Sequence, residues 1–206
     1  EIPKRDWSSD VCSSDLPLND NLGNRTVVVP KIATLDAGPQ FFAVGTTTTR
    51  PANTTAYSAN DSISNNGTAA SVTATSASIT DENDQPFFLD EVLLTTTDTG
   101  AGGVQIRVHI FNSDPTANSG VGAGDNAAWS NKQAGWQCSF SGTLIAFSDG
   151  ARGVSIPDQV RPRLLVPTSG AKTIYYQLQT LGSLTPSANS TTYTPTFKGR
   201  LARAQG

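Results

Sequence analysis

The chain has 206 residues, a formal net charge of −3 and only 15% charged residues. A weakly charged chain without clusters of Lys and Arg lacks the positive surface on which nucleic-acid affinity depends, which argues against DNA or RNA as a partner. No apolar run approaches the roughly 18 residues of a membrane-spanning helix, so we expect no membrane partner. The length fits a single domain, because all-β domains often reach about 200 residues without splitting.

The first segment looks foreign to the rest of the chain. Residues 6–16 read DWSSDVCSSDL, which resembles a translated sequencing-library adapter, and we predict that residues 1–22 are an artefactual or disordered leader. Because the chain begins with Glu and contains no Met, we also expect that the natural start is missing. Residues 1–16 carry two basic and four acidic side chains, so the remainder has a net charge of −1. Cys138 is then the one remaining cysteine, and no disulfide framework is expected.

Residues 23–50 are predicted to form an extended N-terminal arm or linker. Its apolar clusters either pair as an edge strand or reach a neighbouring subunit, and residues 46–49, four consecutive Thr, are typical of a linker. The candidate interface residues of the arm are Val27, Val28, Val29, Phe41 and Phe42.

Residues 51–206 are predicted to form the β domain. The clearest strand is Val104–Ile110, in which apolar and polar residues alternate through seven positions. This alternation predicts that Ile106 and Val108 face the core and that Arg107 and His109 face solvent.

Further strands are predicted from shorter alternations rich in β-branched and aromatic residues, and turn residues such as Asp149-Gly150 separate them. Because no segment has a helical period, the pattern favours an all-β fold, namely an antiparallel β-sandwich of jelly-roll-like type with an extended N-terminal arm. The other predicted strands are 26–29, 71–79, 87–95, 142–147, 160–166, 173–180 and 194–201.

No residue pattern indicates catalysis, and we expect neither an enzyme nor a cofactor. His109 is the single histidine, and no Gly-x-Ser-x-Gly motif supplies a nucleophile for it, so we interpret it as a surface residue. Cys138 is interpreted as a small buried or half-buried apolar group. The acidic run 81–84 lies between two predicted strands and is interpreted as a solvated turn rather than a pair of hydrolase carboxylates.

The longest irregular stretch, 112–130, is either a functional loop or an elaborated connection. Asp125, Asn126 and Trp129 are the candidate interface residues in it. Asp114, Asp125 and Asn126 could offer oxygen ligands to calcium, but their spacing lacks the regular form of a calcium loop, so no metal is expected.

From Arg50 onward, the succession of segments is similar to a group of bacteriophage virion proteins. The segments are RPANTTAYSANDSIS (50–64), LDEVLLTTT (89–97), VQIRVHIFNSDPT (104–116), GDNAAWS (124–130), GTLIAF (142–147) and IYYQLQTLGSLTPSANSTTYTPTFKGRL (174–201). The resemblance implies a structural protein of the phage particle, of head-decoration or minor-capsid type, with no catalytic residues to transfer. The partners that it implies are the major capsid protein or other virion proteins, and we expect a homo-oligomer.

Two alternatives remain open: a tail or fibre component, and a carbohydrate-binding or adhesin-type module. The aromatic residues distinguish the last class, because a binding module should place Trp129, Trp136 or several tyrosines on one exposed platform, whereas a structural protein should bury them or place them at subunit contacts.

Overall fold

The computed structural model describes residues 40–116, 124–129, 135–159 and 164–202. Within these residues the helical segments are two short 3₁₀ turns, η1 (Ala69–Ser71) and η2 (Thr99–Ala101), and the remaining regular structure is β-strand. The fold is therefore all-β, as the alternating sequence pattern predicts. In chain order the strands are β1 (Phe41–Gly45), β2 (Thr48–Thr49), β3 (Ser62–Ile63), β4 (Thr75–Ser78), β5 (Phe87–Thr96), β6 (Gln105–Phe111), β7 (Trp136–Thr143), β8 (Ile145–Phe147), β9 (Gly150–Pro157), β10 (Leu164–Leu165), β11 (Thr173–Thr180) and β12 (Thr192–Leu201).

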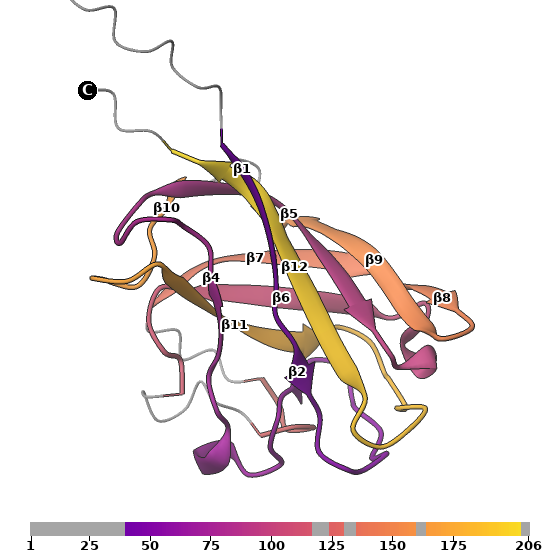
Figure 1. The fold of residues 1–206 in the computed structure, drawn as a ribbon. Coiled ribbons are helices and arrows are strands. Elements are labelled where there is room, and N and C mark those ends of the chain that lie inside the picture. The colour runs from indigo at the N-terminus through magenta and orange to yellow at the C-terminus, as the bar shows by residue number, and fades with distance from the viewer. Residues whose placement is uncertain (1–39, 117–123, 130–134, 160–163, 203–206) are drawn as a thin grey trace, which may run out of the picture. The chain divides into compact units, whose positions relative to one another are not determined.

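The described strands form one curled antiparallel sheet in the order β1-β12-β5-β9-β7-β6-β11-β3. The short strands β2, β4, β8 and β10 pair with β12, β11, β9 and β5. Strand β9 pairs with β5 through residues 151–155 and with β7 through residues 156–157, so the sheet turns over along this strand. Figure 1 shows the result, with β1, β12 and β5 in front of β7, β6 and β11.

The core lies inside the curl and is built by alternation along the strands. In β12, Tyr193 and Phe197 are fully buried, whereas the threonines beside them are partly exposed. The ring of Phe197 meets Tyr176 of β11 edge to face, with centroids 5.5 Å apart, which joins the two halves of the sheet across the core. Cys138 is also part of this core, which confirms that it is buried, as predicted.

Several predicted strands are confirmed. Strand β11 has the predicted bounds, and β5, β6 and β12 differ from the predicted bounds by one or two residues at an end. Ile106, Val108 and Ile110 are fully buried, as the alternation in this strand predicts. Residues 26–29 lie outside the described residues, and of the predicted strand 160–166 only residues 164–166 are described, with β10 in them.

Other strands differ from the prediction. The predicted strand 142–147 is broken at Leu144, whose buried side chain separates the end of β7 from β8. Of the predicted strand 71–79, only Thr75–Ser78 form a strand, β4, and Ser71 belongs to η1. Strand β9 was not predicted, because the two glycines in its sequence GARGVSIP obscure the alternation of apolar and polar residues. Both glycines lie where a neighbouring strand or its end comes too close for a side chain. A Cβ at Gly153, for example, would overlap the carbonyl oxygen of Thr143.

Residues 41–50, assigned from sequence to the N-terminal arm or linker, are paired in the sheet. Strand β1 pairs antiparallel with β12 from Phe41 opposite Arg200 to Gly45 opposite Thr196, so the edge-strand alternative holds for this part. The Thr run contributes β2, which also pairs with β12. The rest of the predicted leader and arm, residues 1–39, lies outside the described residues.

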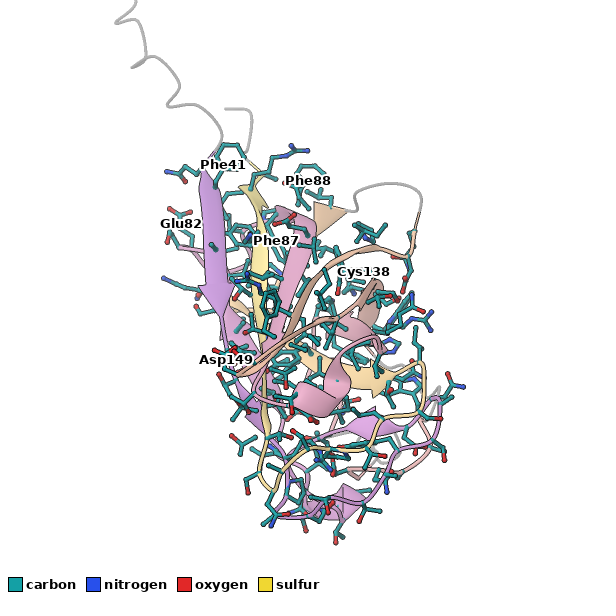
Figure 2. All side chains as sticks on the ribbon, turned by 90° about the vertical axis from the view of Figure 1, so that its right-hand side faces the viewer. Phe41, Glu82, Phe87, Phe88, Cys138 and Asp149 are labelled. Carbon is teal, nitrogen blue, oxygen red and sulfur yellow. The ribbon has the colours of Figure 1, made fainter. Side chains whose placement is uncertain are left out.

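The acidic run 81–84 forms an exposed turn, as predicted from its turn-forming residues. Figure 2 places Glu82 of this turn at the surface. In the parts of the chain that the structure describes, no helix is long and apolar enough to cross a membrane.

Candidate functional site

The residues proposed from sequence as an interface fall in three places. Val27, Val28 and Val29 lie outside the described residues. Phe41 and Phe42 are in β1, where Phe41 is 73% exposed and Phe42 packs against the core. The other three candidates, Asp125, Asn126 and Trp129, belong to the segment 124–129.

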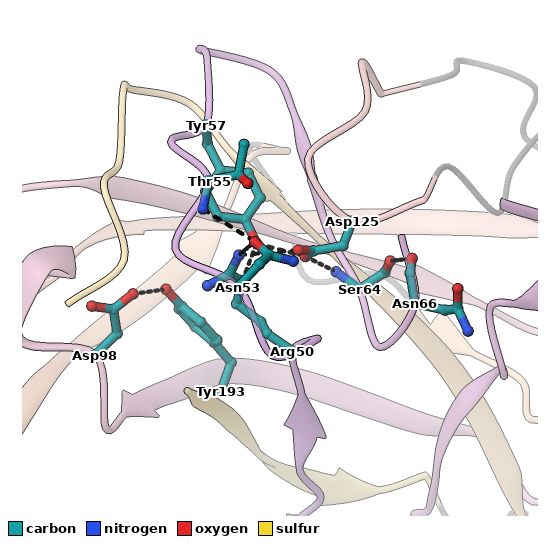
Figure 3. Close-up of polar contacts among 9 residues, drawn as sticks. All are labelled: Arg50, Asn53, Thr55, Tyr57, Ser64, Asn66, Asp98, Asp125 and Tyr193. Atoms are coloured by element: carbon teal, nitrogen blue, oxygen red, sulfur yellow. Dashed lines mark hydrogen bonds and ion pairs between the residues drawn. The ribbon is translucent and has the colours of Figure 1, made fainter. Parts of the chain in front are cut away.

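Asp125 is a buried ion-pair partner and not a surface contact, which corrects its assignment to an interface. Its Oδ2 lies 3.0 Å from Nη2 of Arg50, and the two side chains are 1% and 0% exposed. The Tyr57 hydroxyl donates to Asp125 Oδ1 over 2.5 Å and accepts a hydrogen bond from Arg50 Nε, as Figure 3 shows. The backbone N–H of Ser64 donates to the same Asp125 oxygen over 3.1 Å. This network fixes the segment 124–129 to the chain that leads out of β2.

Burial raises the pKa of Tyr57, and the Asp125 carboxylate raises it further. The phenol therefore stays protonated and acts as a donor toward Asp125. A carboxylate that receives hydrogen bonds from a guanidinium, a phenol and a backbone N–H has its charge compensated in the interior. Arg50 and Asp125 are 75 positions apart, and no local sequence pattern marks them as partners.

A second buried carboxylate fixes the loop after β5. Tyr193 donates to Asp98 Oδ2 over 2.9 Å, and the backbone N–H groups of Gly100 and Ser187 donate to Oδ1 over 3.0 and 2.8 Å. Figure 3 shows Asp98 and Tyr193 in the same close-up as the Arg50 network. Burial raises the pKa of Tyr193, and the neighbouring Asp98 raises it further, so this phenol is also a donor. Both networks hold loops in place through buried carboxylates.

His109 is buried, which corrects the expectation that it faces solvent. It is only 4% exposed, because Trp129 stacks on its ring with centroids 4.1 Å apart and planes 9° apart. Its Nε2 lies 3.0 Å from Oε1 of Gln179, and Trp136 Nε1 donates to its Nδ1 over 3.3 Å. Burial lowers the pKa of His109 to about 4, so the imidazole is neutral at pH 7. The side of β6 on which His109 lies was predicted correctly, but Trp129 of the segment 124–129 covers this side.

A serine and an aspartate lie near His109, as in a hydrolase catalytic triad, but the hydrogen bonds among the three residues differ from those of a triad. Ser139 lies opposite His109 in the β6–β7 pairing, and Asp158 is close by. The Ser139 hydroxyl donates to Asp158 Oδ2 over 2.5 Å, and Asp158 also pairs with Arg107 at 3.0 Å. Both His109 nitrogens are engaged by Gln179 and Trp136. Among the contacts of the described residues there is thus no serine–histidine hydrogen bond to activate a nucleophile.

Each of the three residues considered for calcium has another structural role. Asp125 is held by Arg50, and Asp114 accepts hydrogen bonds from the backbone and hydroxyl of Thr116. Asn126 has a left-handed backbone, with φ of 61°, as suits a tight turn. In the described part of the chain, no group of three His, Cys, Asp or Glu side chains is placed to hold a metal ion.

The outer face of the sheet carries a hollow of about 480 Å³, which we call the threonine hollow. One wall is formed by outward-facing threonines, namely Thr95 of β5, Thr97 directly after β5, and Thr192 and Thr194 of β12. The other wall is the β8–β9 hairpin, whose tip carries Asp149, labelled in Figure 2. The hollow is lined by Thr95, Thr96, Thr97, Phe147, Asp149, Gly150, Ala151, Arg152, Thr192 and Thr194.

Apolar side chains extend from the threonine hollow along the outer face of β8 and β9. Ile145, Val154 and Ile156 are 66%, 49% and 65% exposed. This surface was not predicted from the sequence because strand β9, on which Val154 and Ile156 alternate with buried residues, was not predicted either.

Comparison with models of protein families, with curated proteins and with solved structures finds no match to this chain.

Proposed function

We propose that this protein is a non-enzymatic structural component of a bacteriophage virion, of head-decoration or minor-capsid type, with the major capsid protein as its partner. The observation that carries the proposal is the placement of its aromatic residues. Trp129 and Trp136 both turn toward buried His109, and Tyr57, Tyr176 and Tyr193 are in the core. Tyr57, Tyr176 and Tyr193 are buried and the two tryptophans are half-buried, and among the described residues this placement supports a structural role over the exposed aromatic platform expected of a carbohydrate-binding module.

We also propose that the curled sheet is a jelly roll. The strand order supports this reading, because one half of the sheet runs β1-β12-β5-β9 and the other runs β7-β6-β11 with β4 beside β11. Early and late strands are paired in both halves, β1 with β12 and β4 with β11, as happens when a long hairpin is rolled up. Jelly rolls recur in viral capsids, and also in lectins, so the fold agrees with the proposal without deciding it.

The proposed attachment surface is the exposed apolar strip of Ile145, Val154 and Ile156. A contact made by apolar side chains is insensitive to screening, whereas one made by charge steering weakens steeply with ionic strength. Binding to pre-assembled shells should therefore change little between about 0.05 and 0.5 M salt. Several copies on one shell would add their weak contacts, which fits the expected homo-oligomer.

Mass spectrometry and immunogold labelling of purified particles test the proposal directly. We expect the protein on the head; labelling of the tail would favour the tail or fibre alternative, and absence from particles would overturn the virion role. Binding of purified protein to shells that lack it then tests the surface. Ile156→Lys should abolish sedimentation with shells, and Leu164→Lys, a similar change at a 54% exposed residue of β10, should not.

A variant without residues 1–39 separates the strip from the predicted arm. This truncation retains β1, β2 and buried Arg50, whereas a start at Arg50 would remove two paired strands. If the truncated protein folds but no longer binds shells, the tether lies in residues 1–39 and not on β8 and β9.

A further inference from the structure

We propose that the threonine hollow binds a neutral saccharide, with room for about one sugar ring. Its volume of about 480 Å³ falls in the range of small-molecule sites. A saccharide presents hydroxyl groups around its rim and a patch of C–H groups on a ring face. The hollow offers groups that match both, and this binding activity goes beyond the structural role proposed above.

The hydroxyl wall follows from the strand register. Thr95 of β5 lies opposite Thr194 of β12, and its hydroxyl donates to the Thr194 carbonyl over 3.3 Å. One step along, the Thr97 and Thr192 hydroxyls are 3.2 Å apart. Each hydroxyl has one donor and two acceptor positions, so these contacts hold the side chains in place and leave capacity for a ligand. The threonine hydroxyl oxygens of the two adjacent strands therefore lie side by side along this wall.

The opposite wall supplies an apolar ring and a planar donor. Phe147 is 41% exposed, and the guanidinium of Arg152 lies 4.2 Å from its ring centroid. Arg152 lies opposite Thr95 in the β5–β9 pairing, and both residues line the hollow. In the described residues Arg152 forms no ion pair, which leaves N–H groups that can bind two neighbouring hydroxyls of one sugar.

Charge favours a neutral ligand over an ionic one. The lining holds one cation, Arg152, and one carboxylate, Asp149, at the tip of the hairpin. An anionic ligand would be drawn to Arg152 and repelled by Asp149, whereas a polyol can donate to the carboxylate and accept from the guanidinium.

The walls of the threonine hollow are packed closely against the buried residues beneath them. Gly150 lies so close to β5 that a Cβ would overlap the carbonyl oxygen of Thr96. The Thr96 hydroxyl accepts from the backbone N–H of Asp98 over 3.0 Å, which ties the wall to the buried Asp98–Tyr193 network. Because the walls are set by this close packing, a ligand does not have to order them on binding.

Two-dimensional NMR of the ¹⁵N-labelled full chain tests the site with free D-glucose, D-galactose and N-acetylglucosamine, each raised to about 100 mM to cover millimolar affinities. We expect saturable shifts of the Thr95, Thr97 and Arg152 amide signals with at least one sugar. Sodium acetate and a trialanine peptide are the competing probes. No saturable shift with any sugar, or saturation only with acetate or the peptide, would overturn the proposal.

Variants locate the binding. Phe147→Ala removes the apolar wall, and Thr194→Val removes one hydroxyl without changing shape; each should weaken sugar binding by at least about fivefold, a change of about 1 kcal/mol. Thr54→Val, the same change at an exposed threonine outside the hollow, should have no effect. Unchanged affinity in the Thr194 variant would also count against the site. These measurements use isolated protein, so their outcome is independent of whether the protein occurs in particles.

Discussion

The indole of Trp129 lies flat on the imidazole of His109, with the two rings 4.1 Å apart and 9° from parallel. This contact converts a residue on the outward side of β6 into a buried one. It also connects the segment 124–129 to the sheet at a second point, since Asp125 of the same segment is paired with Arg50. The consequences can be measured through the titration of the imidazole.

His109 makes the protein sensitive to mild acid. Burial lowers its pKa to about 4, and Arg107 adds to this effect while Gln179 and Asp158 oppose it. In the unfolded chain the imidazole takes up a proton below its ordinary pKa of about 6.5, whereas the folded protein does not until about pH 4. Stability is therefore lost as pH falls from about 6.5 to about 4, by about 3 kcal/mol for this group.

Urea denaturation at pH 7.5 and pH 4.5 checks this prediction in the native protein and in His109→Gln. The variant cannot titrate at this position, so the difference in its unfolding free energy between the two pH values should be smaller. The same loss in both proteins would assign the acid sensitivity to carboxylates.

Removal of the Asp125 charge should be costly. Asp125→Ala leaves Arg50 buried and unpaired, and we expect a loss of about 3–5 kcal/mol in the free energy of unfolding. The control is Glu91→Ala, which breaks the pair with Lys198 whose side chains are 38% and 39% exposed. This half-exposed pair should contribute under about 1 kcal/mol. Similar losses in the two variants, measured by urea denaturation, would contradict the assignment.

Substitution of two phenylalanines by alanine compares a core position with a position on the edge strand. Phe197→Ala removes a fully buried ring that packs against Tyr176, and we expect a loss of about 3–5 kcal/mol. Phe41→Ala makes the same change at a ring that is 73% exposed, and its cost should stay within about 0.5 kcal/mol. A large cost at Phe41, again from equilibrium unfolding, would show that this ring is covered in solution, for instance by a second copy of the chain.

Gly150→Ala tests the close approach of the β8–β9 hairpin to β5. A Cβ at this position overlaps the Thr96 carbonyl oxygen, so the hairpin must move, and we expect a loss of more than about 1 kcal/mol. Gly67→Ala is the control, because a Cβ there meets no atom within 4 Å. A thermal melt in which the two variants lose equal stability would show that the hairpin is not tightly packed.

Much of the fold follows from the sequence because strand alternation is a local property. The alternation over Val104–Ile110 predicts a strand whose Ile106 and Val108 face the core, and both are fully buried. The predicted exposure of His109 is wrong, because alternation gives the side of a strand on which a residue lies and not what covers that side. Trp129, 20 positions away in the chain, decides the exposure of His109.

The sites were less predictable than the strands. Asp125 looked like a loop carboxylate open to a metal or a partner, and only the fold reveals that Arg50 and Tyr57 enclose it. To predict the threonine hollow from the sequence, one would have to know the register of β5, β9 and β12 and the position of the β8–β9 hairpin tip. Strand β9 was not predicted, so the hollow was not predicted either.

By itself, the sequence determined the all-β class, the inward residues of the strongest strands and the turn at residues 81–84, since each depends on neighbours in the chain. The tertiary structure decided the strand order, the inclusion of residues 41–50 in the sheet, the burial of His109 and Asp125 and the walls of the threonine hollow. The physical reason is that backbone hydrogen bonding and side-chain alternation act over a few residues, whereas burial and charge pairing depend on contacts between segments that the chain brings together only when it folds.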